Sequence, residues 1–159
     1  VEQLQTHSVE REYSAIVYGH MISGDTINEA IGRDPKDRVK QAILTNGKEA
    51  LTHYRVIDRF KSHTHVKAIL ETGRTHQIRV HLSHIEHPLI GDPMYGGRVR
   101  FPKKACQELK DELINFQRQA LHSKKLTLTH PANGKSMTWK ADLPDDMQEL
   151  LNILKNFDS

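Results

Sequence analysis

Apolar residues alternate with polar ones, or cluster with β-branched and aromatic residues, in several short stretches of the chain. These patterns are typical of strands. They predict strands over residues 12–18, 52–57, 66–70, 121–128 and 136–140. Because Asn133-Gly134 lies between the last two stretches, we expect a tight turn there and a hairpin around it.

Three further stretches carry apolar residues at helical spacing. The first, residues 73–85, is opened by Gly73 and predicts a central helix with a buried side. The second, residues 105–116, predicts an amphipathic helix that packs on the sheet, and the third begins at Pro144. This order of elements predicts one α+β domain, in which helices flank a mixed, largely antiparallel sheet.

The composition suits one domain. The chain has 159 residues, and 36% of them are apolar, which is enough for a core. The single cysteine, Cys106, excludes an internal disulfide and fits a reducing compartment. No apolar run approaches the ~18 residues of a membrane span, and no signal peptide is visible. We therefore expect a cytoplasmic protein without a membrane partner, and a monomer, since nothing in the sequence demands a second subunit.

The formal net charge of +3 is mildly basic, so the position of the charges is more informative than their sum. Basic residues gather in two predicted loops: Arg33, Lys36, Arg38 and Lys40 in one, and Arg98, Arg100, Lys103 and Lys104 in the other. Each cluster is either a solvated surface or a contact for nucleic acid. The sequence leaves both interpretations open.

The densest chemistry lies in residues 71–82 and 87–97. Arg79 falls in the N-terminal half of the predicted central helix, where its guanidinium could pair with a carboxylate or a phosphate through two hydrogen bonds. Arg74, at the preceding turn, is placed to meet a phosphate together with free backbone N–H groups. The alternative for both arginines is an ordinary structural ion pair.

Four histidines in this region, His76, His81, His84 and His87, suggest a metal site. Zinc sites usually add a cysteine or a carboxylate at fixed spacing, and neither H-E-x-x-H nor a nearby cysteine occurs here. We therefore expect no metal. His76 and Gln77 are expected to form hydrogen bonds with loops around the site, and His81 and His84 to be partly buried.

Two tyrosines and an aspartate have both structural and functional interpretations. Tyr13 is either a half-buried aromatic residue of the sheet or a flat surface on which an extruded base stacks. For Tyr95 we favour a rigid turn with the ring as its buried plug. Asp92, in the same Gly-Asp-Pro-Met-Tyr-Gly-Gly segment, is expected to cap backbone amides of the turn rather than take part in chemistry.

Several of these segments resemble motifs of the RluA family of pseudouridine synthases. Residues 73–81 read Gly-Arg-Thr-His-Gln-Ile-Arg-Val-His, and they resemble one family motif, with residues 87–97 resembling the segment that follows it. Arg11-Glu12-Tyr13 resembles the family's basic-x-Tyr motif, and Gln119-Ala120-Leu121-His122 resembles its later A-L-H strand. The match spans essentially the whole chain, so the resemblance implies the pseudouridine synthase fold.

The resemblance also implies an isomerase of large-subunit (23S) ribosomal RNA, which flips a uridine out, detaches uracil from the ribose and rejoins it through carbon. Arg79 would be the basic partner of the catalytic aspartate, and Tyr13 would stack on the base and take part in proton transfer. The substrate-binding residues that it implies, of which the two apolar ones line a wall, are Arg74, His76, Gln77, Ile78 and Leu121. Neither a metal nor an organic cofactor is expected.

The family's nucleophile is an aspartate in an H-R-L-D motif, and no such motif occurs in these 159 residues. We therefore expect residues 1–159 to be the C-terminal part of one catalytic domain, without the nucleophile segment and without an S4-like RNA-binding domain. Such a chain should be inactive alone. Two alternatives remain: a noncatalytic RNA-binding module, which would explain the basic loops and the missing carboxylate together, and a metal-dependent hydrolase built on the histidines.

Overall fold

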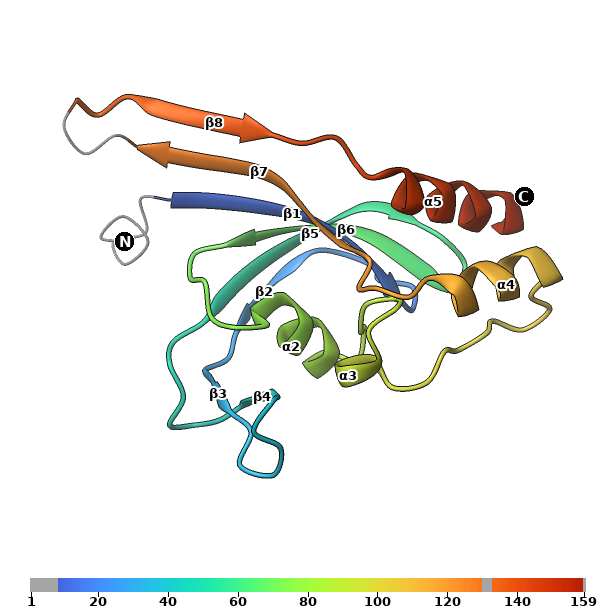
Figure 1. Cartoon of the computed structure of the whole chain (residues 1–159), viewed down its shortest axis with the longest axis horizontal. Helices are drawn as coiled ribbons and strands as arrows, with labels where there is room; N and C mark the ends of the chain where they lie inside the picture. The colour runs from blue at the N-terminus through green and yellow to red at the C-terminus, as the bar shows by residue number, and fades with distance from the viewer. Residues whose placement is uncertain (1–8, 130–132, 159) are drawn as a thin grey trace.

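A six-stranded antiparallel sheet forms the centre of the structure, a computed structural model that describes residues 9–129 and 133–158 (Figure 1). The strand order is β2-β5-β6-β1-β7-β8, so β1 lies inside the sheet, between β6 and β7. The strands are β1 (Val9–Tyr18), β2 (Asp25–Asn28), β5 (Leu51–Arg59), β6 (His63–Leu70), β7 (Leu121–Thr129) and β8 (Ser136–Lys140).

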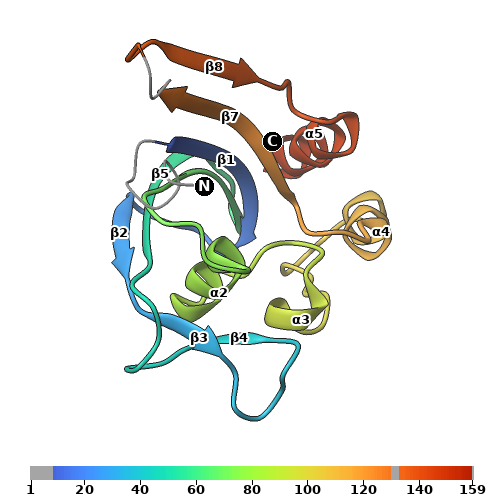
Figure 2. The same cartoon turned by 60° about the vertical axis from the view of Figure 1, so that its left-hand side comes forward.

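A small hairpin and four helices complete the described part of the chain. Strands β3 (Ile31–Arg33) and β4 (Gln41–Ile43) form a separate two-stranded sheet, and Ile31 also forms a β-bridge with Lys48. The helices are α2 (Gln77–His84), α3 (Pro93–Gly96), α4 (Gln107–Asn115) and α5 (Asp145–Asp158). Figure 2 shows α2 and α3 between the main sheet and the β3–β4 hairpin, and α4 beside α5 at another edge. None of the helices in the described ranges is long and apolar enough to cross a membrane.

Strand β1 contributes to two hydrophobic cores, because successive residues of a strand point to opposite faces of the sheet. Ala15 and Val17 belong to the core that includes α2. Ile16 and Tyr18 belong to the core that includes α4 and α5. The stripe predicted for the terminal helix supplies three fully buried residues to this second core: Met147, Leu150 and Leu154. The predicted α+β class, with helices flanking a largely antiparallel sheet, is confirmed.

The central helix begins at Gln77, so the predicted start at Gly73 was wrong. The chain turns first, and His76 adopts the left-handed conformation with φ 56° immediately before the helix. Gly73 has another role. A Cβ at this position would lie 1.8 Å from Nη1 of Arg11, so the glycine leaves room for that guanidinium.

The connection between β7 and β8 includes Asn133-Gly134, where a tight turn is predicted. Thr129 pairs with Ser136, so the connection comprises residues 130–135, of which 130–132 lie outside the described ranges. Strands β2, β3 and β4 were not predicted from the sequence. Each of these strands has only three or four residues, which is too short to display a period.

His63, the first residue of β6, is 1% exposed, and its Nε2 has no hydrogen-bond partner among the described residues. Its ring centroid lies 5.5 Å from that of Tyr18. Burial lowers the pKa of His63 from 6.5 to about 4, because the charged ring would lose its hydration. Burial also lowers the pKa of His65 and of His81, so all three rings resist protonation in the folded state.

We expect the protein to lose stability as the pH falls from 6.5 to about 4. In this window the unfolded chain binds a proton at His63 and the folded chain does not. The free energy of unfolding therefore begins to fall near the pKa of His63 in the unfolded chain. It levels off below the pKa in the folded chain, after a total loss of about 3 kcal/mol for this residue. Urea unfolding at several pH values measures it.

The His63→Phe variant should show a shallower pH dependence than the wild type, since the ring no longer titrates. His84 is exposed, so His84→Gln is the matched control and should retain the wild-type dependence. Equal slopes for the wild type and His63→Phe would contradict the prediction.

Candidate active site

A cavity of about 280 Å³ opens beside β1, the start of β7 and the turn that leads from β6 into α2; we call it the Arg79 cavity. Antiparallel pairing sets Arg11 opposite Leu70 of β6, and Tyr13 lies two residues further along β1, on the same face. All seven candidate residues line the cavity: Tyr13, Arg74, His76, Gln77, Ile78, Arg79 and Leu121. Arg11, Leu70 and Gly73 complete the lining, and the sequence analysis did not select them.

Arg79 is held by a carboxylate of its own chain. Its Nε donates to Oδ2 of Asp92 at 2.9 Å, and its Nη2 donates to Oδ1 at 3.0 Å. The two side chains are 13% and 1% exposed, so this ion pair is almost dry. The Cζ of Arg79 also lies 4.9 Å from the centroid of the Tyr95 ring. Arg79 therefore agrees with both the structural and the functional interpretation, because its side chain forms an ion pair and also lines the cavity.

The sequence analysis assigned Asp92 only to capping the turn, which was incomplete. The carboxylate does accept the Tyr95 N–H, at 3.4 Å, but its shorter bonds are those with Arg79. A buried arginine needs a carboxylate partner, and this requirement is the signal that could have identified the pair.

The hydroxyl of Tyr95 joins the β3–β4 hairpin to the Arg79 cavity. It accepts the backbone N–H of Gln41 at 2.9 Å and lies 2.7 Å from Nδ1 of His76. Burial, followed by the charge of Arg79, lowers the pKa of His76, so the ring is neutral at pH 7. A neutral ring with its proton on Nε2 accepts the Tyr95 hydroxyl at Nδ1. Tyr95, predicted as the buried plug of the turn, is half-buried.

Gln77 fixes the turn that carries the cavity. Its Oε1 accepts the Thr72 hydroxyl at 2.7 Å and the Arg74 N–H at 3.0 Å. Its Nε2 donates to the Leu51 carbonyl and to the Thr52 hydroxyl, each at 2.9 Å. The amide has therefore used its whole hydrogen-bonding capacity within the protein, and it acts on the cavity by holding the turn.

The backbone N–H of Arg74 is bound by Gln77, so it is not one of the free N–H groups that were expected to meet a phosphate together with this side chain. The side chain remains placed for an anion. Its Nε donates to the Glu49 carbonyl at 2.7 Å, and its guanidinium lines the cavity.

The histidines do not assemble around a common point. His81 is fully buried, with Nδ1 2.8 Å from the Thr52 hydroxyl and Nε2 2.8 Å from the Glu29 carbonyl. His84 is exposed, against the prediction that it is partly buried. Across residues 9–129 and 133–158, no three His, Cys, Asp or Glu side chains are grouped to hold a metal ion. The geometry therefore gives no support to the metal-dependent hydrolase.

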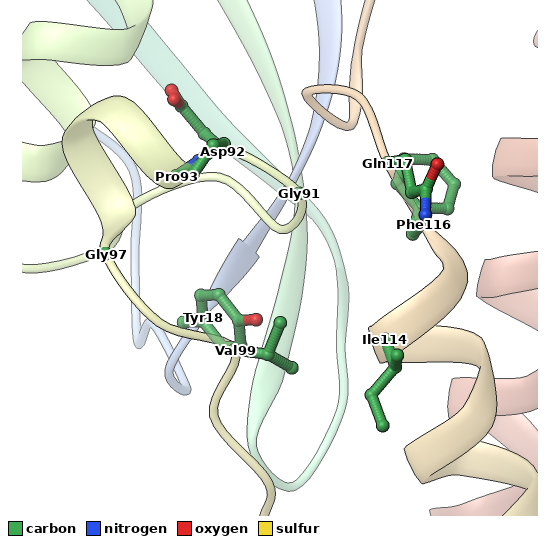
Figure 3. Close-up of a pocket in the computed structure, with 9 residues that line it drawn as sticks. All are labelled: Tyr18, Gly91, Asp92, Pro93, Gly97, Val99, Ile114, Phe116 and Gln117. Carbon is green, nitrogen blue, oxygen red and sulfur yellow. The ribbon is translucent and has the colours of Figure 1, made fainter.

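A second cavity, of about 250 Å³, has Asp92 among its lining residues (Figure 3). Tyr18, Val99 and Ile114 form part of its wall, and the Asp92 carboxylate points away from them. Gly91 permits this orientation, because it has φ 79° and a Cβ there would lie 2.0 Å from the Arg118 carbonyl oxygen. The turn at Gly91 thus directs Asp92 toward Arg79.

The chain is similar in sequence to known proteins. A family model described as RNA pseudouridylate synthase matches residues 1–84. Over 155 residues the chain is 54% identical to the ribosomal large subunit pseudouridine synthase D of Pseudomonas aeruginosa and 50% identical to that of Escherichia coli. Each alignment covers 98% of this chain and 48% of the relative, so the chain spans about half the length of these curated relatives.

A solved structure shares the fold. Human RNA Pseudouridylate Synthase Domain Containing 4 superposes with a TM-score of 0.73 at 26% sequence identity. The match covers 97% of this chain and 65% of that chain. The architecture around the Arg79 cavity is therefore one that a pseudouridylate synthase domain also adopts.

Proposed function

Because this chain belongs to the RNA pseudouridylate synthase family, we propose that it forms the arginine-bearing part of an active site that converts uridines of large-subunit (23S) ribosomal RNA to pseudouridine. The observation that carries the proposal is the Arg79 cavity, where a clamped guanidinium and the Tyr13 ring line the same space. The names of the relatives support the large ribosomal subunit as the source of the substrate. The partner proposed is thus ribosomal RNA, bound in the cytoplasm by a monomer.

In this proposal Arg79 keeps a second carboxylate ionised. Asp92 occupies Nε and Nη2, and no described residue binds Nη1. A nucleophilic carboxylate that approaches Nη1 would gain a charge-assisted hydrogen bond in a site with little water, which lowers its pKa. The guanidinium does not reorganise when the carboxylate arrives, because Asp92 already fixes it.

The other candidates receive the flipped nucleotide. Tyr13 is half-buried in β1 and offers a flat ring for the uracil, and Ile78 and Leu121 supply apolar parts of the cavity wall. Attack of the nucleophilic carboxylate on C1′ would form a C1′–O bond and break the bond between C1′ and N1. The uracil then turns, and C5 displaces the carboxylate from C1′. The C5 proton leaves to a base, a transfer for which the Tyr13 hydroxyl is the candidate in the cavity, and N1 takes up a proton.

Asp92 itself is not the nucleophile in this scheme. Its side chain is 1% exposed, it does not line the Arg79 cavity, and both of its oxygens bind Arg79. We propose that the nucleophile belongs to sequence outside these 159 residues, since no H-R-L-D motif occurs within them, and that residues 1–159 are the C-terminal part of one catalytic domain.

The test is tritium release from large-subunit ribosomal RNA that carries 5-tritiated uridine. The chain alone should release none, whereas the chain fused to a family segment with the H-R-L-D motif, which we call the assembled enzyme, should release it. An Asp→Asn change in that motif is the control and should stop the release. Release by the chain alone would refute the domain assignment, and RNA binding without release by either protein would favour the noncatalytic RNA-binding module.

A further inference from the structure

Another cavity, of about 470 Å³, adjoins the Arg79 cavity and is distinct from the one that Asp92 lines. We call it the basic groove. It shares Gly73 and Arg74 with the Arg79 cavity, so the two cavities adjoin at these residues. Arg33, Lys48 and Arg74 line it, and no acidic side chain of the described residues does. The groove thus extends the site along one side, with Arg74 at the junction.

The β3–β4 hairpin supplies one wall of the groove, and this wall packs against the rest of the domain. Ile31 of β3 is 2% exposed and packs with Ala50 and with Val80 of α2. The Gln41 N–H of β4 donates to the Tyr95 hydroxyl. Figure 2 shows the hairpin running beside α2 and α3. The backbone that carries Arg33 therefore has a fixed position relative to the Arg79 cavity.

Apart from Arg79, the basic side chains that line the two cavities form no ion pair with a carboxylate in the part of the chain that the structure describes. The ion pairs there include Arg79 and Arg118, but not Arg11, Arg33, Lys48 or Arg74. The acids of the hairpin loop bind their own backbone: Asp34 accepts the Lys36 N–H and Asp37 accepts the Val39 N–H. A row of such cations beside a cavity creates a positive potential that attracts a polyanion.

We propose that the basic groove binds the phosphodiester backbone of the RNA strand that continues from the nucleotide in the Arg79 cavity, with Arg33 and Lys48 as the phosphate contacts. This inference rests on the proposed function, because it takes RNA as the substrate. It also gives a role to the cluster of basic residues between 33 and 40, of which Arg33 reaches the groove. Guanidinium and ammonium groups on phosphates fix the register of a strand without reading its sequence.

The test compares two double variants of the assembled enzyme. Arg33→Gln with Lys48→Gln removes both groove cations, and Lys103→Gln with Lys104→Gln removes the same net charge from an exposed loop outside the groove. Binding to a large-subunit ribosomal RNA transcript is measured as a function of salt. We expect the groove variant to bind roughly tenfold more weakly at 0.1 M salt, with a salt slope shallower by about 0.7 for each phosphate that is no longer neutralised. The loop variant should keep the wild-type slope.

Turnover separates this inference from the proposed function. The groove variant should show a raised KM with kcat unchanged at saturating RNA, since its residues lie outside the Arg79 cavity. An unchanged salt slope, or an equal loss in both double variants, would overturn the inference while leaving the isomerase proposal intact. If the assembled enzyme never releases tritium but the groove variant alone loses RNA affinity, the isomerase proposal fails and the groove stands.

Discussion

Replacing Arg79 by alanine is expected to lower tritium release by the assembled enzyme by roughly 10³-fold, because the nucleophilic carboxylate loses the cation that keeps it ionised and oriented. The loss should appear in kcat, with RNA affinity nearly unchanged, since the phosphate contacts that we propose lie in the basic groove. Single-turnover tritium release and filter binding on the same transcript measure the two quantities.

The variant needs a control for folding. Arg79→Ala alone leaves the Asp92 carboxylate buried without its partner, at a cost of about 3–5 kcal/mol. Removing both charges, with Arg79→Ala and Asp92→Ala together, takes away most of this penalty because no buried charge is left unpaired. We expect the double variant to regain stability in urea unfolding and to remain inactive. Turnover by a well-folded double variant would refute the role assigned to Arg79.

Arg79→Lys tests charge separately from geometry. Lysine keeps one positive charge but cannot form two parallel hydrogen bonds with Asp92 and a third with a second carboxylate. Activity between that of the wild type and that of Arg79→Ala is therefore expected.

The sequence predicted well those strands and helices in which buried residues recur at regular spacing along the chain. Strand β1 alternates between two cores, and α5 carries three fully buried residues at helical spacing, so each pattern is long enough to read. The β3–β4 hairpin has no such repeat. Its position depends on Ile31 packing with residues far along the chain, which no local pattern encodes.

The candidate site was likewise predicted only in part from the sequence. The residues of the Arg79 cavity were selected because their motifs resemble a known family, and their placement depends on β1 lying between β6 and β7. The pairing of Arg79 with Asp92 was missed because it depends on the turn at Gly91. That turn is set by a positive φ and by close contact with the Arg118 carbonyl, a residue 27 positions further along the chain.

Asp92→Asn is expected to lower kcat by roughly 10²-fold with little change in KM, because the guanidinium would lose the acceptor that holds it. One oxygen becomes an NH₂ group that faces the N–H donors of Arg79, so the two parallel bonds cannot both persist. The free energy of unfolding should fall by about 3 kcal/mol at neutral pH, because the pair is almost dry. Urea unfolding and steady-state tritium release measure these effects.

The chain offers a matched control in a second arginine–aspartate pair. Arg118 binds Asp146 through Nε and Nη2, each at 2.7 Å, with the same geometry as the buried pair. Its side chains are 42% and 47% exposed, so the pair is worth less than about 1 kcal/mol. Asp146→Asn should therefore leave both stability and turnover close to the wild type. If Asp92→Asn lowered stability but kept the wild-type kcat, Asp92 would stabilise the fold without positioning Arg79, and the guanidinium would reach its active orientation through the Tyr95 ring and the arriving carboxylate alone.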